Sequence, residues 1–190
     1  FPNRTLKNAG LLSVTDTGDV DLANSQAFAL VDHQIAHVYV DQDEISAVRS
    51  SLQSCRGIAE IRKPTPSSDH PSGGDLVLVA EHDAWFQYYW WLDETNAPPY
   101  ASDVDIHTKP GFDPCELFLG EAAPISLDPK QVGGSHGHTD VEGHGIFGLG
   151  GPAAPDFDSE QIDARAVAPT IAELLDIKDV NGSFEVSSVV

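Results

Sequence analysis

The stretch QAFALVDHQ, residues 26–34, places a continuous apolar run directly before three polar residues. An uninterrupted run of this kind is typical of a strand that is buried on both faces in a parallel sheet. Ligands bind beyond the carboxyl ends of strands in open α/β sheets, so Asp32 and His33 are the first candidates for a functional site. The sequence therefore predicts a buried parallel strand over 26–31 that leads into a ligand-binding turn.

Other strand-like and helix-like segments follow on both sides of this stretch. Apolar residues at helical spacing predict a helix over 43–55, and a short N-terminal helix is expected to close at Gly10. Pro169 and the apolar stripe after it predict a helix near the C-terminus. The remaining apolar runs predict strands at 11–14, 37–40, 58–62, 75–80, 84–92 and 145–151. We expect the aromatic residues of 84–92 to belong to the core. The pattern predicts an α/β fold with a mixed sheet.

A long irregular region interrupts this pattern. Residues 93–145 are dense in Pro, Gly, Asp and His, and a stretch of this length without regular structure is unusual unless it is functional. We therefore expect a single domain over 1–190, in which 1–36 and 133–190 form the core and 37–132 form an irregular insertion.

Charge and hydropathy exclude several classes of function. The chain has 30 acidic residues against 10 Lys and Arg, and its formal net charge is −20. Such a surface repels nucleic-acid backbones and anionic membrane surfaces, so neither is an expected partner. A hydrophobic share of 41% is too high for a disordered acidic tail. No apolar run approaches the roughly 18 residues of a membrane span.

The ends of the sequence and its two cysteines add two expectations. The chain has no Met and opens at Phe1 without a signal peptide, so we expect it to be a piece of a longer protein. Cys55 and Cys115 are too few for a disulfide framework, and we favour two separate thiols over a pair.

Histidines and carboxylates gather in three places. Asp32 and His33 are adjacent, and the glycine-rich loop GGSHGHTDVEGHG places His136, His138 and His144 close to Asp140 and Glu142. A second polar loop carries Asp105, His107 and Lys109. Imidazole and carboxylate together suit zinc, manganese or iron. The alternative is that the Asp-His pair is solvated or caps a helix, and that the His-rich loop binds metal only adventitiously.

Motifs for other catalytic chemistries are missing from the sequence. It contains no GxSxG elbow between a strand and a helix, no GxxxxGK[ST] phosphate loop and no GxGxxG that opens a helix after a strand. The sequence therefore predicts neither a serine-hydrolase elbow nor a nucleotide-phosphate loop.

Four segments together resemble the alkaline phosphatase superfamily, and most closely its type I phosphodiesterase and nucleotide pyrophosphatase branch. FALVDHQ (28–34) resembles the metal-binding Asp-His-Gly turn of that family, and GSHG (134–137) resembles its second metal loop. GIFGLGGP (145–152) and VAPTIAELLDI (167–177) follow in the same order as in the family. The resemblance covers nearly the whole chain but only the C-terminal part of the family's catalytic domain.

This resemblance implies part of an alkaline-phosphatase-like three-layer sandwich and a metal-dependent hydrolase of phosphoric esters, acting on a phosphodiester or nucleotide pyrophosphate bond. It implies two divalent ions, zinc in first place with manganese or iron as alternatives. Asp32 and His33 would hold one ion and His136 the other, while Asp105, His107 and Lys109 would shape the substrate mouth.

The resemblance also implies that the nucleophile lies upstream of this chain. The expected partners are then a phosphate-ester substrate and either the N-terminal half of the same enzyme or a second copy of the chain. The alternative function is a non-catalytic metal-binding or protein-interaction module that is built from the same fold.

Overall fold

A computed structural model describes residues 1–65, 70–103, 114–121, 123–138, 145–152, 154 and 162–177. The chain divides into two compact units, 1–144 and 145–190, and each is described by itself. The first unit contains the sheet and all the candidate metal ligands of the described residues.

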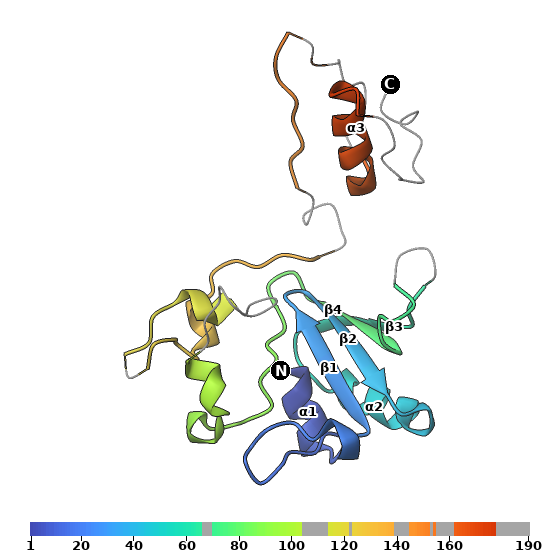
Figure 1. Cartoon of the computed structure of the whole chain (residues 1–190). Coiled ribbons are helices and arrows are strands. Elements are labelled where there is room, and N and C mark those ends of the chain that lie inside the picture. The colour runs from blue at the N-terminus through green and yellow to red at the C-terminus, as the bar shows by residue number, and fades with distance from the viewer. Residues whose placement is uncertain are drawn as a thin grey trace. The chain divides into compact units, whose positions relative to one another are not determined.

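The described part of the first unit is built on a four-stranded antiparallel sheet (Figure 1). Its strands, in the order β1-β2-β4-β3, are β1 (Ala27–Asp32), β2 (Ile35–Val40), β4 (Leu76–Ala80) and β3 (Ile58–Arg62). The strands predicted at 37–40, 58–62 and 75–80 are thus confirmed. The order places β2 and β4 in the centre, and β1 and β3 at the edges.

The prediction of a parallel strand buried on both faces is wrong for 26–31. β1 is an edge strand that pairs with β2 in antiparallel orientation, from Ala27 opposite Val40 to Asp32 opposite Ile35. Its exposure alternates, since Ala29 is fully buried and Leu30 is 53% exposed. A continuous apolar run does not by itself distinguish a two-faced strand from a half-exposed one. Within the described sheet, the strand buried along its whole length is the central β4.

Two helices cover one face of the sheet, where the core lies (Figure 1). They are α1 (Pro2–Asn8) and α2 (Ile45–Gln53), close to the helices predicted from the sequence. Leu6 of α1 and Leu52 of α2 are fully buried in the same cluster as Ala29 and Val38. The small side chains of β1 and the apolar stripes of the two helices therefore belong to one core.

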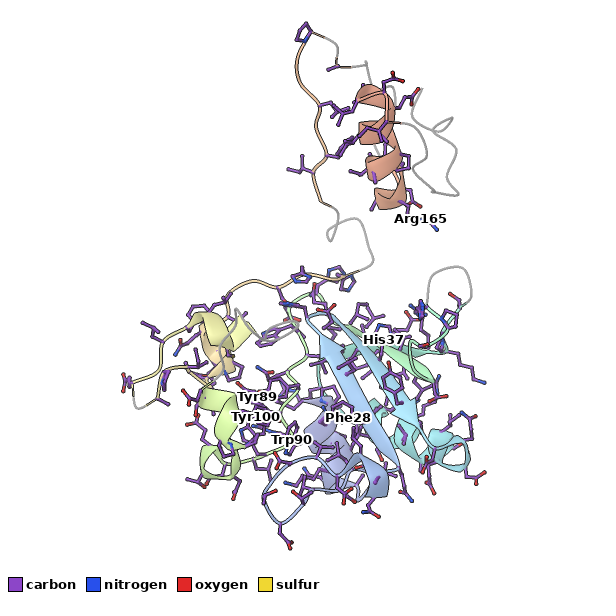
Figure 2. The ribbon with its side chains drawn as sticks, in the orientation of Figure 1. Phe28, His37, Tyr89, Trp90, Tyr100 and Arg165 are labelled. Carbon is purple, nitrogen blue, oxygen red and sulfur yellow. The ribbon has the colours of Figure 1, made fainter. Side chains whose placement is uncertain are left out.

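The aromatic segment 84–92 is not a strand, although its residues favour strands. It forms no backbone ladder with β1, and it is held beside this strand by side-chain hydrogen bonds and by the backbone bond from the N–H of Phe86 to the carbonyl oxygen of His33 at 2.6 Å. The buried Asn3 amide donates to the carbonyl oxygens of Ala29 and Tyr88, each at 2.9 Å, and its Oδ1 accepts from the N–H of Ala29 at 2.8 Å. Trp90 and Trp91 are buried, which confirms that the segment contributes to the core. Tyr89 and Trp90 of this segment are labelled in Figure 2.

The described parts of the remaining chain in the first unit consist of irregular segments and short 3-10 turns. The predicted strand at 11–14 is reduced to a single bridge between Val14 and Val20. Cys55 and Cys115 are two separate thiols that form no disulfide with each other, as favoured from the sequence, although only Cys115 is buried. The 3-10 turns are Leu22–Asn24, Gln42–Glu44, Glu94–Asn96, Pro99–Ser102, Pro114–Leu117 and Pro129–Gln131.

The described residues of the second unit form a 3-10 turn, Ala164–Ala166, and the helix α3 (Val167–Leu174). This confirms the predicted C-terminal helix, but its apolar stripe, including Leu174, is substantially exposed. Arg165 hydrogen-bonds to Asp163 and holds the pKa of that carboxyl at about 2.

The prediction of a buried strand over 145–151 is wrong, because the segment has no ladder pairing and Ile146 is fully exposed.

The architecture is therefore a mixed α/β structure with an antiparallel sheet. The division of the chain into a core and an insertion at residues 37 and 132 stays a prediction. Among the described residues, no helix combines the length and the apolar character needed to cross a membrane.

Gly74 offers a test of how the chain enters β4. Its φ is +80°, and a Cβ built on it would lie 2.8 Å from the carbonyl oxygen of Val38. We expect Gly74→Ala to lower the free energy of unfolding by about 2 kcal/mol, from left-handed strain and from the collision with backbone. Urea denaturation of both proteins measures this loss. Gly148→Ala is the control, because its Cβ would meet nothing within 4 Å, and equal stability of the two variants would contradict the prediction.

Candidate metal centre

The site begins at the tip of the β1–β2 hairpin. Asp32 pairs with Ile35, so His33 and Gln34 form a two-residue turn. His33 has a φ of +55°, a left-handed conformation that is uncommon for residues other than glycine. A positive φ at the first turn residue matches the twist of hairpin strands. The turn therefore places Asp32, the last residue of β1, beside an imidazole at the tip.

The segment 132–138 lies against this turn. The N–H of Gln34 donates to the carbonyl oxygen of His136 at 3.0 Å. Gly137 has a φ of +101°, and a Cβ at that position would lie 3.5 Å from the nitrogen of Gln34 and 3.6 Å from the carbonyl oxygen of Asp32. Close backbone approach thus brings His136 to the hairpin tip from a distant part of the chain.

Asp32, His33 and His136 form a cluster at this junction. One potential ligand atom of each residue lies within 4.8 Å of the corresponding atoms of the other two. The two imidazole rings are tilted by 36°, with their centroids 3.7 Å apart. Asp32 and His136 are exposed and His33 is half-buried. Two imidazoles and one carboxylate are a donor set that suits zinc, iron or manganese.

A serine next to His136 contacts the cluster as well. The Oγ of Ser135 lies 3.0 Å from Nδ1 of His33. A histidine that ligates a metal through one ring nitrogen commonly forms a hydrogen bond through its other ring nitrogen. Ser135 was not a candidate from the sequence, because it is one small polar residue in a loop that is rich in them.

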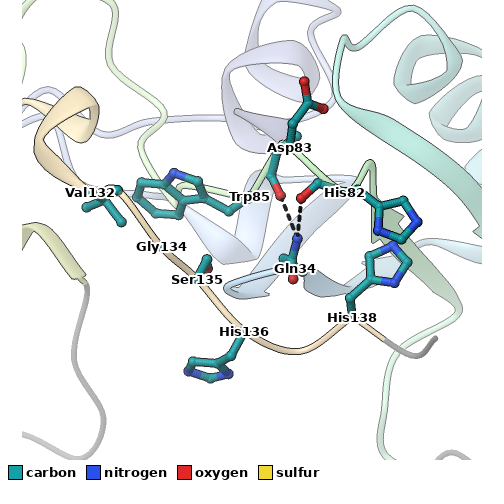
Figure 3. A pocket seen from close by; sticks show the side chains of 11 residues that line it. Gln34, His82, Asp83, Trp85, Val132, Gly134, Ser135, His136 and His138 are labelled. Carbon is teal, nitrogen blue, oxygen red and sulfur yellow. Dashed lines mark hydrogen bonds between the residues drawn. The ribbon is translucent and has the colours of Figure 1, made fainter. Parts of the chain in front are cut away.

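An open pocket of about 490 Å³ adjoins the cluster (Figure 3). Its floor is fixed by Gln34, whose side-chain amide donates to the carbonyl oxygens of His82 at 3.3 Å and Ala84 at 3.0 Å. Ser135 and His136 belong both to the pocket wall and to the surroundings of the cluster. The lining consists of Gln34, His82, Asp83, Ala84, Trp85, Val132, Gly133, Gly134, Ser135, His136 and His138.

Two further histidines form one end of the pocket. The rings of His82 and His138 stack with centroids 4.3 Å apart, as Figure 3 shows. Nε2 of His138 lies 3.1 Å from the carbonyl oxygen of Ala80, which can only accept, so this nitrogen carries the proton. The bond ties the segment 132–138 to the end of β4.

The structure thus brings together the three residues predicted as metal ligands, Asp32, His33 and His136. His82, which was not a candidate for the site from the sequence, is exposed and lines the pocket. Trp85, expected in the core, lines the pocket too. The predicted substrate residues lie outside the described residues, as do the other ligand candidates of the glycine-rich loop: Asp105, His107, Lys109, Asp140, Glu142 and His144.

The chain was compared with family models, with curated proteins and with solved structures. None of the three comparisons gave a match. Function must therefore be argued from the cluster, the pocket and the resemblance of the sequence segments.

Proposed function

We propose that this chain is part of a metal-dependent hydrolase of phosphoric esters, and that Asp32, His33 and His136 hold a divalent ion, with zinc the first candidate. The observation that carries the proposal is the convergence of their three ligand atoms within 4.8 Å of one another. The same three residues are those that the resemblance to the alkaline phosphatase superfamily selects. The three-layer sandwich of that superfamily is part of the proposal.

The composition of the cluster favours a catalytic over a structural ion. Structural zinc sites use four protein ligands, whereas catalytic sites use three and keep a position for water or substrate. Among the described residues the cluster offers three potential ligands, and two of them are exposed to solvent. The adjoining pocket would admit a substrate next to the ion.

The charge of the chain gives the ion a clear role. A chain with a net charge of −20 repels an anionic phosphate ester, so positive charge must be supplied locally. A divalent ion supplies it, polarises a phosphoryl oxygen and stabilises the charge that develops during hydrolysis.

The number of ions is a narrower question. The resemblance assigns His136 to one ion, and Asp32 and His33 to another. In the structure all three ligand atoms are near enough to share one ion. We therefore propose one ion at this cluster, and a second ion would need ligands that are outside the described residues or supplied by the predicted upstream partner.

The second candidate function is a metal-binding module without catalysis. It is favoured by the sequence, which contains no GxSxG elbow between a strand and a helix and no GxxxxGK[ST] phosphate loop. In that case the cluster would bind the same ion, but the pocket would turn over no ester.

The proposal is tested by measuring metal content and hydrolysis of bis(p-nitrophenyl) phosphate after addition of Zn²⁺ or Mn²⁺. We expect one bound ion per chain, and metal-dependent release of p-nitrophenolate once the predicted upstream segment, which carries the nucleophile, is added in trans. Asp32→Asn should reduce both to background, because it removes the carboxylate ligand. The matched control is Asp16→Asn, an exposed carboxylate in a remote turn, which should behave as the unmodified chain.

Two outcomes would contradict the proposal in different ways. Bound metal without hydrolysis in the presence of the upstream segment would favour the non-catalytic module, whereas recovery of hydrolysis would reject it. Metal binding that survives Asp32→Asn would place the ion elsewhere on the chain.

A further inference from the structure

The hydrogen bond between His33 and Ser135 bears on which nitrogen of His33 can ligate an ion. A neutral imidazole has one N–H and one lone pair, and only the nitrogen with the lone pair can bind metal. Nδ1 of His33 lies 3.0 Å from Oγ of Ser135, so it is engaged by the serine. Nε2 is then the nitrogen that would serve as ligand, and it has its lone pair only if Nδ1 carries the proton.

We propose that Ser135 is a positioning residue, whose hydroxyl accepts the Nδ1–H of His33 and so fixes the tautomer in which Nε2 can bind the ion. This inference rests on the proposed metal site and deepens it. A carboxylate or a backbone carbonyl usually plays this part beside a metal-binding histidine. Here the hydroxyl of Ser135, on the irregular segment 132–138, supplies the acceptor.

The backbone, rather than the serine side chain, places Ser135 at the tip. The next residue, His136, accepts a hydrogen bond from the N–H of Gln34 at 3.0 Å. Gly137 then lies close to the backbone of the hairpin turn. Nε2 of His138 donates a hydrogen bond to the carbonyl oxygen of Ala80. These contacts remain when the hydroxyl is removed, so Ser135→Ala should leave the segment in place and change only the partner of Nδ1.

The bond also restrains the orientation of the ring. His33 sits in a turn and is only half-buried, and its ring lies against that of His136, with the two centroids 3.7 Å apart. A hydrogen bond to a residue 102 positions away keeps the ring at the junction before the ion binds. Preorganisation of this kind raises affinity because fewer rotamers are lost on binding.

The test compares Ser135→Ala, Ser135→Thr and the control Ser50→Ala, an exposed serine on α2. Zn²⁺ affinity is measured by calorimetry with a competing chelator. We expect Ser135→Ala to lower the affinity by about 10- to 100-fold, the usual effect of losing an outer hydrogen-bond partner. Threonine keeps the hydroxyl and should restore the affinity to near that of the unmodified chain, and Ser50→Ala should leave it unchanged.

A second readout reports the tautomer itself. Nitrogen NMR of the metal-free chain distinguishes a protonated Nδ1 from a protonated Nε2 in His33. We expect the Nδ1–H form in the unmodified chain and in Ser135→Thr, and a shift toward the Nε2–H form in Ser135→Ala. A residue that only supported the fold would not move this signal.

The outcomes separate this inference from the metal site on which it rests. If Ser135→Ala keeps both the affinity and the tautomer while His33→Ala loses zinc, the positioning role is wrong and the site stands. An Nε2–H form in the unmodified chain would mean that the serine donates, which also overturns the role. If His33→Ala binds zinc as tightly as the unmodified chain, the assignment of the ligand fails, and the positioning role with it.

Discussion

Replacement of His136 by alanine is expected to lower the affinity for Zn²⁺ by more than about 100-fold, because an outer-shell partner alone contributes about 10- to 100-fold. The variant removes one of three ligands but keeps the backbone carbonyl that accepts from Gln34. The exposed side chain contributes little to the core, so the free energy of unfolding without metal should remain close to that of the unmodified chain. Calorimetry with Zn²⁺ and urea denaturation with chelator measure the two quantities.

The control for this experiment is His70→Ala, which removes an exposed histidine that is not part of the cluster. It should leave zinc affinity unchanged. Equal zinc affinities of the His136→Ala and His70→Ala variants would contradict the assignment of His136. Removing His136 would then have no greater effect than removing a histidine outside the cluster.

The largest loss of stability is expected from Asn3→Ala. The Asn3 side chain is fully buried, and its amide makes three hydrogen bonds to the backbone of Ala29 and Tyr88. The substitution leaves the N–H and the carbonyl oxygen of Ala29 and the carbonyl oxygen of Tyr88 without the asparagine as their hydrogen-bond partner. Each unsatisfied group costs about 1–3 kcal/mol. We expect the free energy of unfolding to fall by about 4 kcal/mol, measured by urea denaturation.

Asn8→Ala provides the matched control, because Asn8 belongs to the same helix and is exposed. Its loss should be below about 0.5 kcal/mol, as for most surface substitutions. Amide hydrogen exchange adds a local measure, since the N–H of Ala29 should lose protection in Asn3→Ala. A loss of less than 1 kcal/mol, with Ala29 still protected, would show that water replaces the asparagine.

Local elements could be predicted from the sequence where one pattern determines them. The helical spacing of Val48 and Leu52 predicts α2, and the apolar run 76–80 predicts β4. The orientation of β1 could not be predicted in this way. His33 and Gln34 contain none of the glycine or Asn-Gly signals of a two-residue hairpin, so nothing in the sequence marks the reversal that makes β1 antiparallel.

The conformation of the segment 84–92 could not be predicted from the sequence either, for a different reason. Its aromatic residues favour a strand, but Asn3 and Gln34 bind the carbonyl oxygens of Tyr88 and Ala84 through their side chains. Such side-chain contacts depend on residues more than 40 positions away, and strand propensity carries no information about them. The result is a segment with the composition of a strand and no ladder.

The proximity of Asp32, His33 and His136 could be predicted from segment resemblance and residue type, and the structure does bring the three residues together; their role as ligands stays a proposal. The residues that hold this arrangement were not predicted. Ser135 acts through one hydroxyl, and Gln34 through a backbone N–H that any residue except proline possesses. Neither contact leaves a recognisable pattern in the sequence.

The separation of the two halves of the proposed metal site along the chain has a consequence for its topology. The hairpin tip and Ser135 are 102 residues apart, so an ion held between the tip and His136 would cross-link the chain into a large ring. Cross-links that close about 100 residues remove much of the conformational entropy of an unfolded chain. A single proteolytic cut within the ring would leave two polypeptides joined by coordination bonds, and addition of a chelator would leave only non-covalent packing to hold them together.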